Sequence, residues 1–183
     1  MSIVRERLLS VLRDPVAASD VRTYFAEAEP GHSTYTGRLF EQFGGGGDRE
    51  GCANAFTADD LIAVESLSVQ VPPEAAYALL HGSFGEELGG WLSQVPTDVD
   101  LGSPEAHTHL GEGSPADRAW TSLKAQPGIG WVTAGKLLAR KRPRLLPVYD
   151  NVVRCVLGEP EGVWLALDGA LAQNRQHGRQ DLF

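Results

Sequence analysis

The chain has 183 residues, two of them cysteine, and a net charge of −8 at pH 7. Two cysteines cannot provide the four thiolates of an iron–sulfur or structural zinc site within one chain, and they offer no disulfide framework. Residues 2–12 place arginines among apolar residues, so they lack the uninterrupted apolar run of a signal peptide or membrane span. We therefore expect a cytoplasmic protein that does not enter a membrane, and the sequence leaves its oligomeric state open.

Helical signals dominate the first 95 residues. Apolar residues recur at helical spacing, and Thr57 and Ser83 are each followed three residues later by an acid, as in a capping box. No segment alternates apolar and polar residues as a half-buried strand does, so we expect an all-α fold. The glycine-rich residues 44–51 are expected to form a surface connection between lobes. The predicted helical segments are 2–12, 19–28, a short one after Gly37 that contains Leu39, Phe40 and Phe43, then 57–67, 72–80 and 83–95.

A long segment without apolar periodicity follows at residues 96–113. Such a stretch in a compact domain is typical of a lid or binding loop, and we expect a long loop here. It contains His107 and His109. A His-x-His pair can contribute to a metal site, but no third ligand is nearby in the sequence, and a solvated pair is the simpler interpretation.

Two helices joined by a tight hairpin are predicted at residues 115–141. Ser114 and Pro115 mark the start of the first helix, as an N-cap followed by a first-turn proline. The sequence Pro127-Gly-Ile-Gly130 predicts the hairpin, because both glycines can adopt backbone angles closed to other residues. The amide N–H groups of such a turn, and of the helix that begins at Gly130, are suited to bind an anionic oxygen.

Positive charge is concentrated around this hairpin. Residues 118–149 contain seven lysines and arginines and no acid, so the remainder of the −8 chain carries −15. A basic segment of this kind indicates an interface for the phosphate backbone of a nucleic acid. The alternative is a solvated helix end whose cations suit the helix dipole.

Asp150 follows a short extended link and precedes the next predicted helix. An aspartate at this position is typical of an N-cap, which satisfies free N–H groups. A carboxylate fixed in this way can also stabilise a developing sugar cation and orient an attacking water. The two roles are compatible, and the sequence leaves open whether Asp150 is a cap alone or a catalytic cap.

The hairpin and Asp150 together resemble a known signature. Pro127-Gly-Ile-Gly-x-x-Thr-Ala-Gly135, followed by Pro147-x-x-Asp150, is similar to the motif of the helix-hairpin-helix-GPD DNA glycosylases, over about residues 114–158. The resemblance implies a two-lobed helical fold, a hairpin that holds the DNA backbone beside an extruded nucleotide, and Asp150 as the catalytic carboxylate.

The resemblance also assigns roles to residues of the hairpin. Bifunctional members carry a nucleophilic lysine where this chain has Val132, so it implies a monofunctional enzyme. No organic cofactor is implied, but a K⁺ or Na⁺ ion at the hairpin is, bound by the backbone carbonyls of Lys124, Gln126 and Ile129. Trp131 and Tyr149 are candidates for stacking on a base, with a place in the core as the alternative. The predicted DNA contacts are Gly128, Ile129, Gly130, Val132, Lys136 and Arg140.

We expect residues 55–150 to form the lobe that bears the hairpin, and residues 1–50 with 151–183 to form a second lobe. The functional hypothesis is a monofunctional DNA glycosylase that removes a damaged or modified base, leaves an abasic site and serves DNA repair. The alternative is a non-catalytic DNA- or protein-binding module on the same scaffold.

Overall fold

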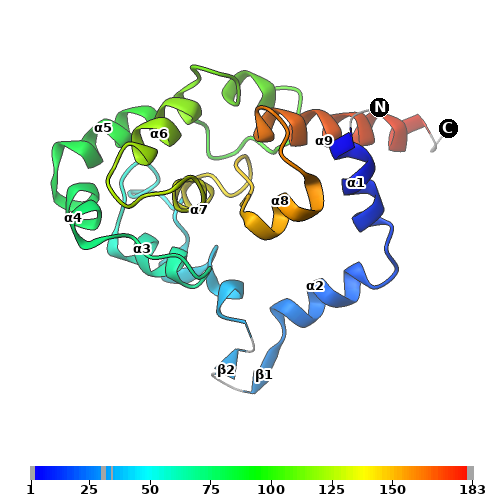
Figure 1. Ribbon diagram of the computed structural model, residues 1–183, viewed down its shortest axis with the longest axis horizontal. Coiled ribbons are helices and arrows are strands. Elements are labelled where there is room, and N and C mark those ends of the chain that lie inside the picture. Colours follow the sequence, from blue (N-terminus) through cyan, green and yellow to red (C-terminus); the bar gives the residue numbers. More distant parts are fainter. Residues whose placement is uncertain (1–2, 30–31, 34, 181–183) are drawn as a thin grey trace.

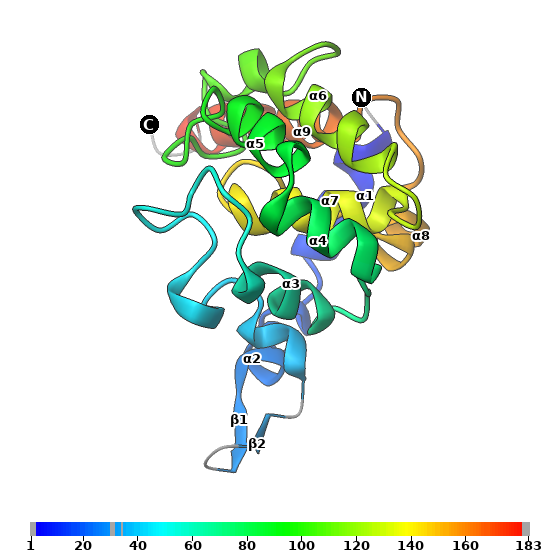
Figure 2. The same cartoon turned by 90° about the vertical axis from the view of Figure 1, so that its left-hand side faces the viewer.

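The computed structural model describes residues 3–29, 32–33 and 35–180 (Figure 1). Within them the chain is almost entirely helical, which confirms the prediction of an all-α fold. The strands are a short antiparallel pair in an arm that projects from the helices (Figure 2). The elements are α1 (Ile3–Leu12), α2 (Ala17–Phe25), β1 (Glu27–Glu29), β2 (His32–Ser33), the 3-10 helices η1 (Thr36–Leu39) and η2 (Phe43–Gly45), α3 (Ala58–Glu65), α4 (Pro73–His81), α5 (Ser83–Leu92), the 3-10 helix η3 (Ala106–His109), α6 (Pro115–Lys124), α7 (Trp131–Lys141), α8 (Asn151–Leu157) and α9 (Val163–Gln180).

Helix α7 runs through the middle of the molecule, with α3 and α6 packed against it (Figures 1 and 2). Every residue from Thr133 to Lys141 is buried. Leu137 and Leu138 pack in the main hydrophobic core, which also contains side chains of α3, α4, α5 and α6. A helix that is covered on all sides is usually apolar all round. Because α7 carries cations as well, these must find partners inside the protein.

Three consecutive cations are buried at the end of α7, and two of them bind the carboxylate of Asp60. We call Asp60, Arg140, Lys141 and Arg142 the cation hub; each of these residues is at most 1% exposed. Arg140 Nε donates to Asp60 Oδ1 at 3.0 Å, and Lys141 Nζ donates to Asp60 Oδ2. Asp60 also accepts the Thr57 N–H at 2.9 Å, which caps α3. One carboxylate therefore fixes the start of α3 to the end of α7.

The hub cations also satisfy backbone carbonyls of two irregular segments. Buried carbonyls outside regular structure need hydrogen-bond partners, and the long cationic side chains supply them. Burial lowers the pKa of Arg142 to about 10, so its guanidinium remains charged at neutral pH. The accepting carbonyls belong to Phe40, Glu41, Phe43, Gly47, Cys52, Ala53, Leu92 and Val95.

Most of the positive charge around residues 118–149 is consequently internal. The prediction that this charge forms a surface for phosphates is wrong for Arg140, Lys141 and Arg142, because their donors bind carbonyls and Asp60 inside the fold. The helix-end alternative, in which the same cations are solvated, is wrong for the same reason. The exposed cations of this segment are Arg118, Lys124 and Arg144.

The first 50 residues divide between two sets of contacts, whereas the sequence predicted that they pack as one group. Helix α1 lies against α8 and α9, where Val4, Leu157 and Leu167 form a second, smaller apolar cluster. Residues 40–47 instead bind the hub on α7, and Phe40 lies in the main core. Trp164 of α9 also belongs to the main core, so α9 contributes to both clusters.

Residues 96–113, predicted to be a long loop, pack closely against the helices. This segment contains η3, and its apolar residues Ala106 and Leu110 are buried. The Gly102 N–H donates to the buried Asp168 Oδ1 of α9 at 2.7 Å. The segment therefore connects α9 to the rest of the fold through polar contacts that a periodicity analysis does not detect.

The glycine-rich segment is likewise a packed turn rather than a flexible connection. Gly46 and Gly47 are buried, and a Cβ atom at Gly47 would lie 2.3 Å from the Arg140 carbonyl oxygen. Gly44, Gly45 and Gly46 have φ angles of 57°, 84° and 93°, which glycine adopts readily. The glycines allow the chain to approach the end of α7 closely.

The cation hub predicts that removing either of two neighbouring carboxylates changes the free energy of unfolding by very different amounts. Asp60→Ala leaves Arg140 and Lys141 buried without a counter-charge, and we expect the free energy of unfolding to fall by at least about 3 kcal/mol. Asp59→Ala removes a half-exposed ion pair with Arg49 and should cost less than about 1 kcal/mol. Urea denaturation at neutral pH measures both values. Equal losses for the two variants would contradict a structural role for the hub.

Candidate active site

The turn between α6 and α7 is fixed by a proline and a glycine. Pro127 and Gly128 occupy its centre, the Ile129 N–H donates to the Gln126 carbonyl at 3.1 Å, and Gly128 has a φ angle of 78°. These features are those of a type II turn, which requires a positive φ at the glycine. A Cβ atom at Gly128 would lie 2.5 Å from Pro72 Cγ, so the turn also packs tightly against the start of α4.

The turn leaves the N-terminal end of α7 accessible. Gly130 is the N-cap residue, has an extended backbone and is exposed, and a Cβ atom there would meet nothing within 4 Å. Trp131 and Val132 follow and are half-buried. The first N–H groups of a helix lack intrahelical acceptors, and they favour an anion at this end. Of the residues predicted to contact DNA here, Gly128 and Gly130 are exposed and Val132 is half-buried, whereas the side chain of Ile129 is buried in the main core.

The carbonyls predicted to bind a cation belong to residues in and beside the same turn. Of its three carbonyls, the Gln126 oxygen accepts the Ile129 N–H that closes the turn, which leaves it one lone pair for an ion. The carbonyls of Lys124 and Ile129 flank it in sequence. This arrangement is compatible with a monovalent cation, and the cation site stays a prediction.

Asp150 is the N-cap of α8. Its Oδ1 accepts the N–H groups of Val152 and Val153 at 3.0 and 3.1 Å, and its Oδ2 lies 3.2 Å from Lys136 Nζ. Burial raises the pKa of Asp150, but the Val153 N–H, Lys136 and the Val152 N–H together outweigh it and hold the pKa below its ordinary value. The side chain is 23% exposed. Asp150 is therefore an ionised cap that still reaches solvent.

Lys136 is buried and forms an ion pair with Asp150, so it is not a surface cation. Its side chain is 6% exposed, and Nζ donates to the Leu67 carbonyl at 2.8 Å as well as to Asp150. The prediction that Lys136 and Arg140 contact DNA phosphates is wrong, because both side chains are buried and their donors are engaged. Lys136 instead fixes the position of Asp150 relative to α7.

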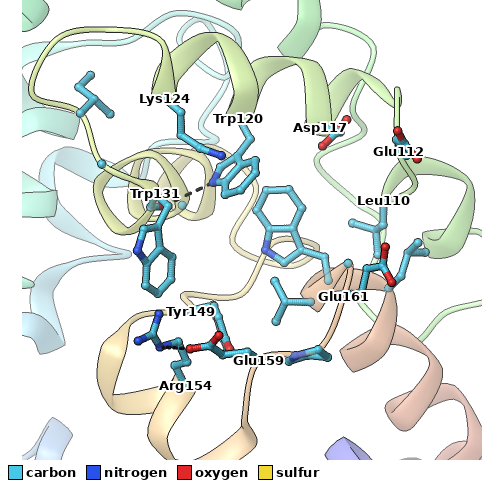
Figure 3. Close-up of a pocket in the computed structure, with 18 residues that line it drawn as sticks. Leu110, Glu112, Asp117, Trp120, Lys124, Trp131, Tyr149, Arg154, Glu159 and Glu161 are labelled. Atoms are coloured by element: carbon cyan, nitrogen blue, oxygen red, sulfur yellow. Dashed lines mark hydrogen bonds and ion pairs between the residues drawn. The ribbon is translucent and has the colours of Figure 1, made fainter.

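A cleft of about 960 Å³ opens between α6, the start of α7 and the connection from α8 to α9. Figure 3 shows four aromatic side chains around it. The Trp131 and Tyr149 rings lie 5.8 Å apart at 49°, and the Trp120 and Trp164 rings lie 6.2 Å apart at 67°. Concave sites with aromatic walls and a few polar groups are typical of small-ligand binding.

The two predicted stacking residues are both in the walls of this cleft. Trp131 and Tyr149 are half-buried, so each presents part of its ring to the cavity. The sequence identified neither Trp120 nor Trp164 as a site residue, because both fit the apolar face of a helix. Only the packing of α6 against α9 reveals that their rings meet.

The polar groups of two of these aromatic residues form hydrogen bonds within the protein. Trp120 Nε1 donates to the Trp131 carbonyl at 3.4 Å, and the Tyr149 hydroxyl donates to the Gly158 carbonyl. Burial raises the pKa of Tyr149, which keeps its hydroxyl protonated as a donor. These rings therefore offer their faces, rather than their polar groups, to a ligand.

Charged side chains surround the aromatic walls. Lys124 Nζ lies 3.7 Å from the centre of the Trp120 ring, and the Arg154 guanidinium lies 5.5 Å from the centre of the Trp131 ring. Arg154 also pairs with Glu159 at 3.0 Å. The carboxylates of the lining are Glu112, Asp117, Glu159 and Glu161. Sequence reasoning did not identify any of these charged residues except Lys124, and that only for its carbonyl.

Asp150 lies next to the cleft rather than in its wall. Tyr149 and Gly135 line the cavity, and Asp150 and Lys136 are their direct successors in the chain. Asp150 and its partner Lys136 are thus chain neighbours of two residues that line the cleft, and their ion pair joins α7 to the start of α8.

Comparison with known proteins places the chain in a family. A family model described as "Family of unknown function (DUF6308)" matches residues 17–182. Neither a curated protein nor a solved structure matches the chain. In the part of the chain that the structure describes, no helix combines the length and apolar character needed to cross a membrane. The same residues contain no group of three His, Cys, Asp or Glu placed to hold a metal, and His107 and His109 both lie in η3.

The pair of Lys136 and Asp150 predicts a coupling that depends on pH. Because the folded-state pKa of Asp150 is lowered, its stabilising contribution is present above the unfolded pKa of about 3.9 and is lost as pH falls through the folded value. A double-mutant cycle of Lys136→Met and Asp150→Asn should give a coupling of ~1 kcal/mol at neutral pH. Urea denaturation across a pH series measures it.

The control cycle combines Lys124→Met with Asp150→Asn, because Lys124 is an exposed lysine of the preceding helix. It should show no coupling at any pH. A coupling between Lys136 and Asp150 that persists unchanged in acid would contradict the ionised pair.

Proposed function

We propose that this chain, which belongs to the family DUF6308, is a monofunctional DNA glycosylase that hydrolyses the N-glycosidic bond of a damaged or modified base and leaves an abasic site. The observation that carries the proposal is the aromatic cleft beside a helix-capping carboxylate. Such a cleft suits an extruded base, and such a carboxylate suits the sugar from which the base departs.

The local architecture supports the resemblance found in the sequence. A tight turn joins helices α6 and α7, which supports the interpretation of this segment as a helix-hairpin-helix. In the proposal, the N–H groups at Gly130 and Trp131 bind a phosphate. Asp150 caps the helix that follows. Cleft, hairpin and carboxylate thus occur together, as base extrusion beside a held backbone requires.

In the proposed reaction the base enters the cleft and lies against the faces of Trp131 and Tyr149. Its sugar then stands near Asp150, whose negative charge stabilises the cation that develops as the glycosidic bond breaks. The lowered pKa makes Asp150 a weak base, so we assign it electrostatic stabilisation and the orientation of water rather than strong proton abstraction. Lys136 and the two N–H groups hold the carboxylate in place.

The monofunctional mechanism that we propose rests on the residue at position 132. Val132 occupies the position at which bifunctional glycosylases carry one, and its side chain cannot form a Schiff base. Lys136 lies one helical turn further on, but it is nearly buried and donates to Leu67 and Asp150. The proposed enzyme therefore releases the base without cleaving the strand.

A second candidate function is a non-catalytic DNA-binding module. The observation that favours it is that both oxygens of Asp150 are engaged, one by two N–H groups and the other by Lys136. A carboxylate held in this way could serve the structure alone. The two candidates share the DNA-binding hairpin and differ in whether a base is released.

The DNA interface can be tested at Lys124, the exposed lysine beside the turn. Lys124→Glu should weaken duplex binding to a similar degree for all sequences and reduce the slope of log affinity against log salt, because phosphate contacts carry no sequence information. Fluorescence anisotropy with labelled duplexes at several salt concentrations measures both effects. The control is Arg22→Glu on α2, which makes the same change of charge far from the turn along the chain. Equal effects of the two variants would remove the hairpin from the interface.

Catalysis can be tested at Asp150. A panel of duplexes that contain single modified bases first identifies the substrate by the formation of abasic sites. With that duplex, Asp150→Asn should lower the single-turnover rate of base release by ~10²-fold or more, because the charge is lost while most of the capping ability is kept. DNA affinity and melting temperature should change little.

Three results distinguish the candidates. Base release by the natural chain that Asp150→Asn abolishes supports the enzyme. DNA binding without base release from any duplex of the panel supports the module. A covalent adduct trapped with borohydride would contradict the monofunctional mechanism, since no Schiff base should form.

A further inference from the structure

We infer that the cleft selects nucleotides whose base presents N–H donors on its pairing edge, in preference to uracil and thymine. This inference rests on the proposed function and names the class of base that the same site accepts. It follows from the distribution of donors and acceptors around the cavity.

The cleft has a cationic end and an acidic end. Figure 3 shows Lys124, Trp131 and Arg154 on one side of the aromatic rings and Glu112, Asp117 and Glu161 on the other. The cationic end coincides with the N-terminal end of α7, because Gly130 and Trp131 are also part of the lining. A nucleotide fits this polarity in one orientation, with the phosphate at the cationic end and the base directed toward the carboxylates.

The charged side chains at the acidic end are carboxylates. Within the described part of the chain, Asn, Gln, Ser, Thr and His are absent from the lining. A carboxylate accepts hydrogen bonds and donates none. The indole N–H of Trp120 and the hydroxyl of Tyr149 donate to backbone carbonyls. The indole N–H groups of Trp131 and Trp164 are the other neutral side-chain donors of the lining.

Two of the carboxylates are available for a ligand. Asp117 Oδ2 accepts the Gly113 N–H at 2.9 Å, and Glu159 pairs with Arg154. Glu112 and Glu161 are exposed, and among the residues with described side chains neither has a hydrogen-bond or ion-pair partner. Glu112 and Glu161 are therefore the groups that can accept from the edge of a base.

The pairing edges of the bases respond differently to such acceptors. Guanine, cytosine and adenine carry exocyclic amino groups that donate to a carboxylate, and guanine adds an adjacent ring N–H. Uracil and thymine have one ring N–H between two carbonyl oxygens. These oxygens are acceptors, so a carboxylate repels them. The acidic end thus favours the first group and acts against the second. The volume of about 960 Å³ is sufficient for a whole nucleotide.

The test uses mononucleotides and the fluorescence of the protein's own tryptophans. Three of the four tryptophans, Trp120, Trp131 and Trp164, line the cleft, so a stacked base should quench their emission. We expect dGMP, dCMP and dAMP to bind about tenfold more tightly than dUMP and dTMP. The double variant Glu112→Gln with Glu161→Gln should lose this preference, because an amide both donates and accepts. The control Glu86→Gln, at an exposed residue of α5 outside the cleft lining, should keep it.

Each outcome decides the inference. Equal affinity for the five nucleotides, an unchanged preference in the double glutamine variant, or no quenching by any nucleotide would overturn it. The measurement is independent of catalysis. A clear nucleotide preference without base release from duplexes would support the inference while the glycosylase proposal fails. Base release from uracil-containing duplexes, with equal affinity for the five nucleotides, would support the glycosylase proposal and overturn the inference.

Discussion

The structure depends on how it neutralises charges that have no access to water. Two cations of α7 share the carboxylate of Asp60, and with Arg142 they satisfy the carbonyls of two irregular segments. Isolated charges in an apolar interior are very unfavourable, so these groups are tolerated only because each has partners. The result is that segments without regular structure acquire fixed positions around α7. Lys136, about one turn before Arg140 on α7, then reaches Asp150.

One helix therefore links the interior to the candidate site. The C-terminal end of α7 holds the hub, its middle holds Lys136, and its N-terminal end begins the cleft at Trp131. The geometry of the site thus follows from a helix that is held over most of its length. This explains how a short helix such as α8, with its cap at Asp150, can present a carboxylate in a defined place.

Short sequence patterns correctly predicted the features that are determined by residues close together in the chain. The all-α class followed from apolar spacing, and the start of α6 followed from Ser114, whose hydroxyl accepts the Asp117 N–H. The turn at Pro127 and Gly128 and the cap at Asp150 were also evident, since each is determined within a few residues. The partners of Arg140 lie 80 to 100 residues away, and no local pattern distinguishes a buried guanidinium from a solvated one. The acidic end of the cleft was missed for the same reason.

The large sequence separations in the hub also determine when the fold can form. A chain made from its N-terminus produces residues 40–54 long before Arg140, so the carbonyls of those segments remain solvated until α7 has been synthesised. Early helices such as α3 can form, but the core they face is completed only when α7 enters it. Ribosome-bound chains that end before residue 142 are therefore candidates for chaperone binding, and the protein gains its native interior in a late step of its synthesis.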